Sequence, residues 1–147
     1  MKLLGIIPLI VFTVLTSDLL AQQHQGEGSK MVKQTNVSPV VIMVHLTKDK
    51  GMDAEMATRF ANISLDRGYK TVIWLTSDGV KLADVNAKET QEVKAIKDFI
   101  SKGGKVYVCP HCSRVLGIKE IIKGTEFSTP EIVFGLLEDS NVKVISW

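Results

Sequence analysis

Short apolar segments alternate with amphipathic segments along most of this chain, and this alternation constrains the fold more than any other feature. Four apolar runs have the length and composition of buried strands, at residues 40–44, 71–75, 106–108 and 142–145. The segments between them space their apolar residues as helices do, at residues 51–68, 89–102, 113–117 and 128–137. The pattern predicts a three-layer α/β/α fold with a parallel central sheet of about four to five strands.

The first 21 residues have the layout of a secretory signal peptide. Lys2 precedes an apolar run over residues 3–15, and a more polar stretch then ends at the small residue Ala21. The run is short for a membrane span of about 20 residues and contains Pro8, so we expect cleavage after Ala21 rather than an uncleaved anchor. The remaining chain would then be periplasmic or secreted, with no membrane association after cleavage.

Residues 22–38 are polar and lack a hydrophobic period, which predicts a flexible tether. The chain is therefore expected to comprise a signal peptide over 1–21, this tether, and one α/β domain over 39–147. Its 18 basic and 16 acidic residues give a net charge of only +2. Because no basic stripe with interleaved aromatic residues is present, we expect no nucleic-acid partner.

Both cysteines of the chain lie in one tetrapeptide, Cys109-Pro110-His111-Cys112. It follows the third apolar run, so we expect it at the carboxyl end of a strand, where α/β sheets gather their reactive groups. A helix that starts here would favour thiolate over thiol, because its first N–H groups are unpaired and carry partial positive charge. Thiolates attack disulfides, accept sulfane sulfur and bind metals. Cys109, Cys112 and His111 are therefore the candidate catalytic residues, and we expect no resident cofactor.

Three kinds of chemistry fit this motif. The tetrapeptide resembles the active site of the thioredoxin-like oxidase DsbA, but only 35 residues follow Cys112 and they contain no hairpin signal. A soft metal, copper(I) or zinc, could bind Cys109, His111 and Cys112 with His45 from a neighbouring loop, although a second ligand pair is absent. The third reading is sulfur transfer through a cysteine persulfide.

Five segments in order resemble the DsrE/DsrF-like proteins, a family that includes a subunit of the bacterial sulfur relay. They are residues 40–47, the first helix with its end Leu65-Asp66-Arg67-Gly68, residues 74–83, residues 106–118 and residues 129–147. No single segment is highly specific, but their order is. The resemblance spans nearly all of residues 39–147 and implies the parallel α/β fold of that family.

The resemblance also assigns roles within the motif. The family's sulfur-carrying cysteine ends a strand and precedes a glycine by eight residues, and Cys109 has this spacing to Gly117 whereas Cys112 does not. Cys109 is then the nucleophile, Cys112 the resolving thiol and His111 a modulator. Leu116 departs from the family, which often has a basic residue at that position.

The family assignment carries expectations about activity and partners. It implies a sulfur carrier or sulfurtransferase, or a thiol-redox protein, that forms a homo-oligomer of three or six copies. It also implies a sulfur-donor or redox partner protein. Two alternatives of other classes stay open, namely a periplasmic protein that binds copper or zinc, and a non-catalytic interaction domain.

Overall fold

The computed structural model describes residues 39–147, so the expected signal peptide and tether lie outside the described residues. The elements, with η1 a 3-10 helix, are β1 (Val41–Leu46), α1 (Gly51–Asp66), β2 (Lys70–Leu75), η1 (Ser77–Ala83), α2 (Gln91–Ser101), β3 (Lys105–Val108), α3 (Pro110–Val115), β4 (Thr125–Phe127), α4 (Pro130–Glu138) and β5 (Val142–Ser146). None of the helices within residues 39–147 is long and apolar enough to cross a membrane.

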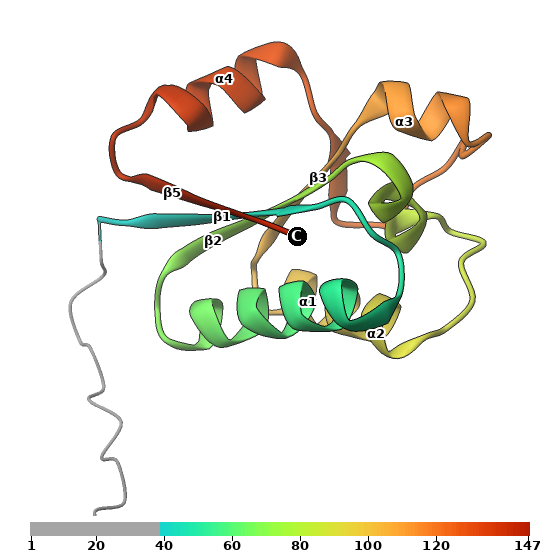
Figure 1. Ribbon diagram of the computed structural model, residues 1–147, viewed down its shortest axis with the longest axis horizontal. Coiled ribbons are helices and arrows are strands. Elements are labelled where there is room, and N and C mark those ends of the chain that lie inside the picture. Colours follow the sequence, from blue (N-terminus) through green and yellow to red (C-terminus); the bar gives the residue numbers. More distant parts are fainter. Residues whose placement is uncertain (1–38) are drawn as a thin grey trace, which may run out of the picture. The chain divides into compact units, whose positions relative to one another are not determined.

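All five strands are parallel and form one sheet in the order β4-β3-β2-β1-β5 (Figure 1). This confirms the predicted α/β fold class. In the register of the sheet, His45 of β1 lies between Trp74 of β2 and Ser146 of β5. The loops after β1, β2 and β3 therefore meet at one edge, the carboxyl edge, as the parallel arrangement requires.

The main core lies between one face of the sheet and helices α1 and α2 (Figure 1). Val44, Leu46, Ile73 and Leu75 project to this face and are fully buried. Helix α2 shows why its sequence folds as it does. Thr90 caps its N-terminus by accepting a hydrogen bond from the Val93 backbone N–H, and Val93, Ile96 and Phe99 follow at helical spacing on the buried face.

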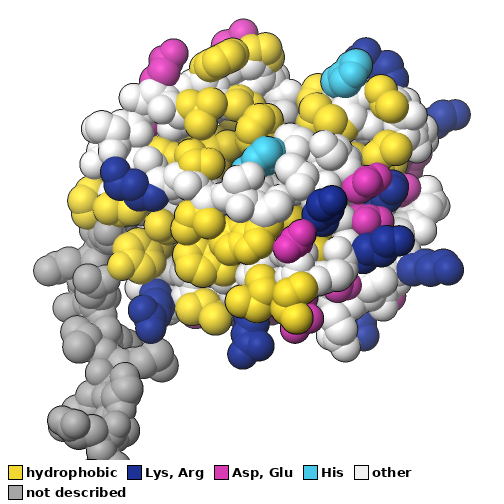
Figure 2. Space-filling model, viewed as in Figure 1, with side chains coloured by type: hydrophobic (Ala, Val, Ile, Leu, Met, Phe, Trp, Pro, Cys, Tyr) yellow, Lys and Arg dark blue, Asp and Glu magenta, His cyan; other side chains and the backbone are white. Residues whose placement is uncertain are grey.

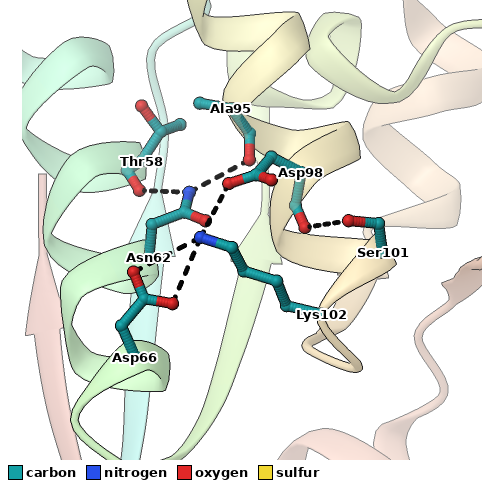
Figure 3. Close-up of polar contacts among 7 residues, drawn as sticks. All are labelled: Thr58, Asn62, Asp66, Ala95, Asp98, Ser101 and Lys102. Carbon is teal, nitrogen blue, oxygen red and sulfur yellow. Dashed lines mark hydrogen bonds and ion pairs between the residues drawn. The ribbon is translucent and has the colours of Figure 1, made fainter.

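A polar bridge joins α1 to α2 on the outside of this layer (Figure 3). The Asn62 Nδ2 group donates to the Ala95 backbone oxygen at 3.0 Å and also to the Thr58 backbone oxygen at 3.0 Å. One turn further along, the Lys102 ammonium pairs with Asp66 at 3.1 Å and with Asp98 at 2.9 Å. These contacts set the spacing of the two helices at a surface that the apolar core does not reach.

The opposite face of the sheet is covered more thinly. Helix α4 packs against β5, but none of its residues is buried. Phe134 is 58% exposed and Leu137 48% exposed on α4, and Val144 of β5 is 46% exposed. Figure 2 shows hydrophobic side chains gathered over α4 and toward the sheet edge below it. Exposed apolar side chains therefore gather on the α4 side of the sheet.

The structure corrects one expectation drawn from the sequence and adds two elements to those predicted. The 113–117 segment is part of a helix that already begins at Pro110. The strand β4 and the 3-10 helix η1 are not among the elements predicted from the sequence, because β4 has only three residues and η1 contains an Asp-Gly pair, which is typical of a turn. Trp74 of β2 is only partly buried, because it projects to the thinly covered face.

Candidate functional site

Cys109 lies where β3 ends and α3 begins. Its backbone N–H donates to the Leu75 oxygen at 2.9 Å, which continues the pairing of β3 with β2. Its side chain takes the N-cap position of α3, with Pro110 in the first turn, and Sγ accepts a hydrogen bond from the Cys112 backbone N–H at 3.4 Å. Cys109 is therefore the residue that caps α3. Buried Ser113 adds a hydrogen bond from its hydroxyl to the Cys109 oxygen at 3.0 Å.

Cys112 lies one turn further along the same helix. Both cysteines are half-buried free thiols that pack against the edge of the core. The Cys112 Sγ accepts a hydrogen bond from the backbone N–H of Ser77, with 3.2 Å between nitrogen and sulfur. Burial raises the pKa of the Cys112 thiol, and its hydrogen bond with Cys109 raises it further, whereas the Ser77 N–H acts in the opposite direction. Cys112 is therefore held as a protonated thiol near neutral pH.

Ser77 is the first residue of η1 and follows Thr76, the residue that joins this turn to β2. With φ of 49°, it is the one non-glycine residue in the left-handed region among residues 39–147. The turn is anchored on the end of β1, since the Thr76 N–H donates to the Leu46 oxygen at 3.0 Å and the Gly79 N–H donates to the Thr47 oxygen at 3.0 Å. Backbone strain of this kind persists only where surrounding contacts hold it.

His45 is bonded on both sides of its ring. Its Nε2 lies 2.8 Å from the Thr76 hydroxyl oxygen, and its Nδ1 lies 2.9 Å from the Ser146 hydroxyl oxygen. The ring stacks on Trp74 with 4.7 Å between centroids. Burial lowers the pKa of His45, so the ring is neutral at pH 7. These contacts tie the ends of β1, β2 and β5 together at the carboxyl edge of the sheet.

The arrangement does not assemble the metal ligands considered from the sequence. His45 lies within β1 rather than in the loop after it, and its two nitrogens face hydroxyl groups. No group of three or more His, Cys, Asp or Glu side chains in residues 39–147 is placed to hold a metal ion. The structure thus corrects the expectation that His45 could complete a set with the cysteines.

His111 and Asp78 take no part in the hydrogen bonds described above. His111 is exposed on the first turn of α3. Asp78 is exposed and pairs with Lys81 at 2.5 Å; this hydrogen bond lowers the pKa of the Asp78 carboxyl. Of the three predicted site residues, the structure therefore links Cys109 and Cys112 directly. It adds Thr76 and Ser77 from the segment after β2, and His45 from β1.

Chemically, the site offers two adjacent sulfur atoms, each of which accepts a backbone N–H. Backbone donors of this kind stabilise a negative sulfur without contributing a proton of their own. The second thiol lies within the same helical turn, where it can attack a sulfur atom bonded to the first. The arrangement suits covalent sulfur chemistry at Cys109 followed by a response from Cys112.

Comparison with known proteins places this architecture. The sequence model of the DsrE/DsrF-like family matches residues 40–144. A comparison with curated protein sequences gave no match. Among solved structures, the ychN protein from E. coli matches with a TM-score of 0.61 at 18% identity, over 74% of this chain and 98% of that one.

A second solved structure agrees. MTH1491 from Methanobacterium thermoautotrophicum, described as a protein of unknown function, matches with a TM-score of 0.60 at 14% identity, over 74% of this chain and 99% of that one. At such identities the two structures report the fold alone. They match nearly their whole length, so the described domain corresponds to the complete fold of each.

Proposed function

Since this chain belongs to the DsrE/DsrF-like family, we propose that it is a sulfur carrier or thiol-redox protein that works through a persulfide on Cys109. Cys109 is the nucleophile and Cys112 the resolving thiol. His111, exposed between them, modulates access and charge at the site. The match to the family supports the sulfur-relay type of fold, and the cysteine geometry supports the chemistry assigned to it.

One observation carries this proposal, namely the placement of both sulfurs in the first turn of α3. The Cys112 N–H donates to the Cys109 Sγ, so a negative charge on Cys109 is stabilised where the helix begins. The pKa of Cys112 is raised by burial and by its hydrogen bond with Cys109. The two thiols are therefore not equivalent, and the difference favours attack by Cys109 and later action by Cys112.

The first step loads sulfur onto the protein. The Cys109 thiolate attacks the outer sulfur of a persulfide donor, R–S–SH. A new S–S bond forms at Cys109, the donor's S–S bond breaks, and the donor leaves as the thiolate R–S⁻. The products are Cys109–S–SH and one thiolate, so atoms and charge balance and no external oxidant is needed.

Two onward steps are open to the loaded protein. An acceptor thiolate can attack the outer sulfur, which transfers that sulfur and regenerates the Cys109 thiolate. Alternatively, the Cys112 thiolate attacks the inner sulfur, so that a Cys109–Cys112 disulfide forms and the outer sulfur leaves as hydrosulfide, HS⁻. The first route is carriage, and the second is redox release.

The experiment that tests the assignment is labelling with a small persulfide donor, read by mass spectrometry of peptides. The wild-type protein and the Cys112→Ser variant should both gain one sulfur on Cys109, and the latter should hold it longer because the resolving thiol is gone. Cys109→Ser should gain none at Cys112. Labelling that survives Cys109→Ser and disappears in Cys112→Ser would reverse the roles.

The proposal includes location and partners. The leader-like residues 1–21 support export to the periplasm or beyond, where a donor or redox partner protein would supply the sulfur. The exposed apolar side chains of α4 and β5 support assembly into a homo-oligomer, and the copy number of three or six is what the family resemblance implies. Export also separates this protein from cytoplasmic sulfur relays, so its acceptor belongs to another process.

A further inference from the structure

A connected set of hydrogen bonds runs from the thinly covered face of the sheet to the sulfur of Cys112. It starts at His45 of β1, whose Nε2 is bonded to the Thr76 hydroxyl at 2.8 Å. Thr76 is followed directly by Ser77, whose backbone N–H donates to the Cys112 Sγ at 3.2 Å. The N–H group that donates to Cys112 thus comes from the segment after β2, whereas Cys112 itself lies on α3, which follows β3.

The backbone of Ser77, which supplies this N–H donor, is held in an unfavourable conformation. Ser77 has φ of 49°, a conformation that residues with a Cβ seldom adopt. Ser77 itself is exposed, so packing of its own side chain does not hold it there. The residues around it hold this conformation instead. The Thr76 N–H and the Gly79 N–H both donate hydrogen bonds to backbone oxygens at the end of β1.

The Thr76 side chain is held by a hydrogen bond between its hydroxyl and His45. The ring in turn is fixed by the Ser146 hydroxyl at 2.9 Å and by stacking on Trp74 at 4.7 Å. Because the neutral ring has one donor and one acceptor nitrogen, both hydroxyl contacts can be satisfied at once. Nothing in the chemistry assigned to the cysteines otherwise uses this histidine.

We infer that His45 is a positioning residue for the Cys112 sulfur, acting through the Thr76 hydroxyl and the backbone N–H of Ser77. The N–H favours the thiolate of Cys112 at the moment it attacks, and His45 keeps the turn in the conformation that aims it. The inference deepens the proposed function, on which it rests for the role of Cys112 as resolving thiol. The hydrogen bonds themselves do not depend on that function.

The test measures the acidity of Cys112 alone. In full-length protein carrying Cys109→Ser, the rate of Cys112 alkylation by iodoacetamide is followed against pH by mass spectrometry. Serine keeps an oxygen acceptor at the N-cap, so α3 retains its start. Thr76→Val removes the hydroxyl and keeps the side-chain shape, and His45→Phe removes both nitrogens and keeps an aromatic ring on Trp74.

Both variants should raise the Cys112 midpoint by about one pKa unit and slow alkylation near pH 8 by about tenfold. The double variant should slow it no further, because both changes act on one contact. Thr76→Ser should restore the original profile. Val41→Ala, on the same strand and face as His45 but at the far end, serves as the control for lost packing.

A second pair of variants removes no packed side chain, because Ser77 is exposed. Ser77→Gly keeps the N–H and accepts positive φ, so the Cys112 profile should be retained, whereas Ser77→Val disfavours that φ and should raise the midpoint. An unchanged profile in Thr76→Val, His45→Phe and Ser77→Val would overturn the inference, even if their melting temperatures fall. Because Cys109 is absent throughout, failure of persulfide loading would not alter this result, so the two claims fail separately.

Discussion

The backbone N–H of Cys112 donates to the Sγ of Cys109 at 3.4 Å, so the first turn of α3 joins the two thiols of the chain. Each sulfur then has a backbone donor of its own, since the Ser77 N–H reaches the Cys112 Sγ. The donors differ in origin, one from the helix and one from the turn after β2. Two thiols in one short turn therefore have different surroundings, and this difference leads to the first prediction.

Replacing Cys109 by Ser should make Cys112 more acidic. The pKa of Cys112 is raised first by burial, then by its hydrogen bond with Cys109 and by the nearby charge that Cys109 can carry. The variant removes the two contributions from Cys109 and leaves burial, so the Cys112 pKa falls toward its ordinary value. More thiolate is then present near pH 8, and alkylation of Cys112 becomes faster. Mass spectrometry of alkylated peptides across pH measures this, and slower alkylation would contradict the assigned cause.

The turn that holds Ser77 should be sensitive at Gly79. A Cβ at this position would overlap the Leu46 backbone oxygen, which belongs to β1 and has no room to move. Gly79→Ala should therefore lower the free energy of unfolding by about 1–3 kcal/mol. Urea denaturation followed by circular dichroism gives the value.

The matched control for this change is Gly135→Ala in α4. No atom lies within 4 Å of a Cβ added there, and the residue is inside a helix. Alanine should stabilise the protein by about 0.5–1 kcal/mol. Equal changes in the free energy of unfolding for the two substitutions would contradict the close approach of η1 to β1.

The bridge between α1 and α2 should depend more on Asn62 than on Lys102. Asn62 Nδ2 donates to the Ala95 oxygen across the two helices, and Asn62→Ala removes this bond while the Ala95 oxygen keeps its hydrogen bond within α2, so the free energy of unfolding should fall by about 0.5–1.5 kcal/mol. Lys102 makes ion pairs with Asp66 and Asp98, but all three groups are in contact with solvent, so Lys102→Ala should change stability little. Thermal unfolding of the two variants compares them directly, and a larger loss in Lys102→Ala would refute this ranking.

The proposed assembly should depend on the apolar side chains of α4. Phe134→Asp puts a charge on a 58% exposed phenylalanine and should shift the protein toward smaller species in sedimentation velocity. Met52→Asp is the control, because Met52 is 70% exposed but lies in the first turn of α1 on the other side of the sheet. The α4 face is not the interface if Phe134→Asp keeps the wild-type sedimentation profile, or if Met52→Asp changes it equally.

The sequence predicts the parts of this fold that depend on local pattern. The apolar runs of β1, β2, β3 and β5 can be recognised in the sequence, because a strand buried on one or both faces needs apolar residues. The start of a helix at Cys109 can be recognised because Pro110 follows it. Strand β4 is not visible, because three residues at a sheet edge carry too little pattern.

The sequence does not predict the contacts that complete the site, for a different reason. Ser77 and Cys112 are 35 residues apart, and a serine with left-handed backbone has no distinguishing neighbour pattern. His45 and Ser146 are 101 residues apart and meet only because β1 lies beside β5. Such pairs follow from strand order, and strand order is set by the packing of the whole domain.

The most direct test of the central claim is the intact mass of the purified protein, taken under non-denaturing conditions without reductant and again after denaturation and reduction. Sulfur carriage predicts an addition of one or two sulfur atoms that maps to Cys109 and disappears on reduction. A mass lower by two hydrogens would indicate a Cys109–Cys112 disulfide and thiol-redox work instead. An unmodified mass that persists after incubation with a persulfide donor, or a metal adduct that is lost when both cysteines are replaced, would contradict the account.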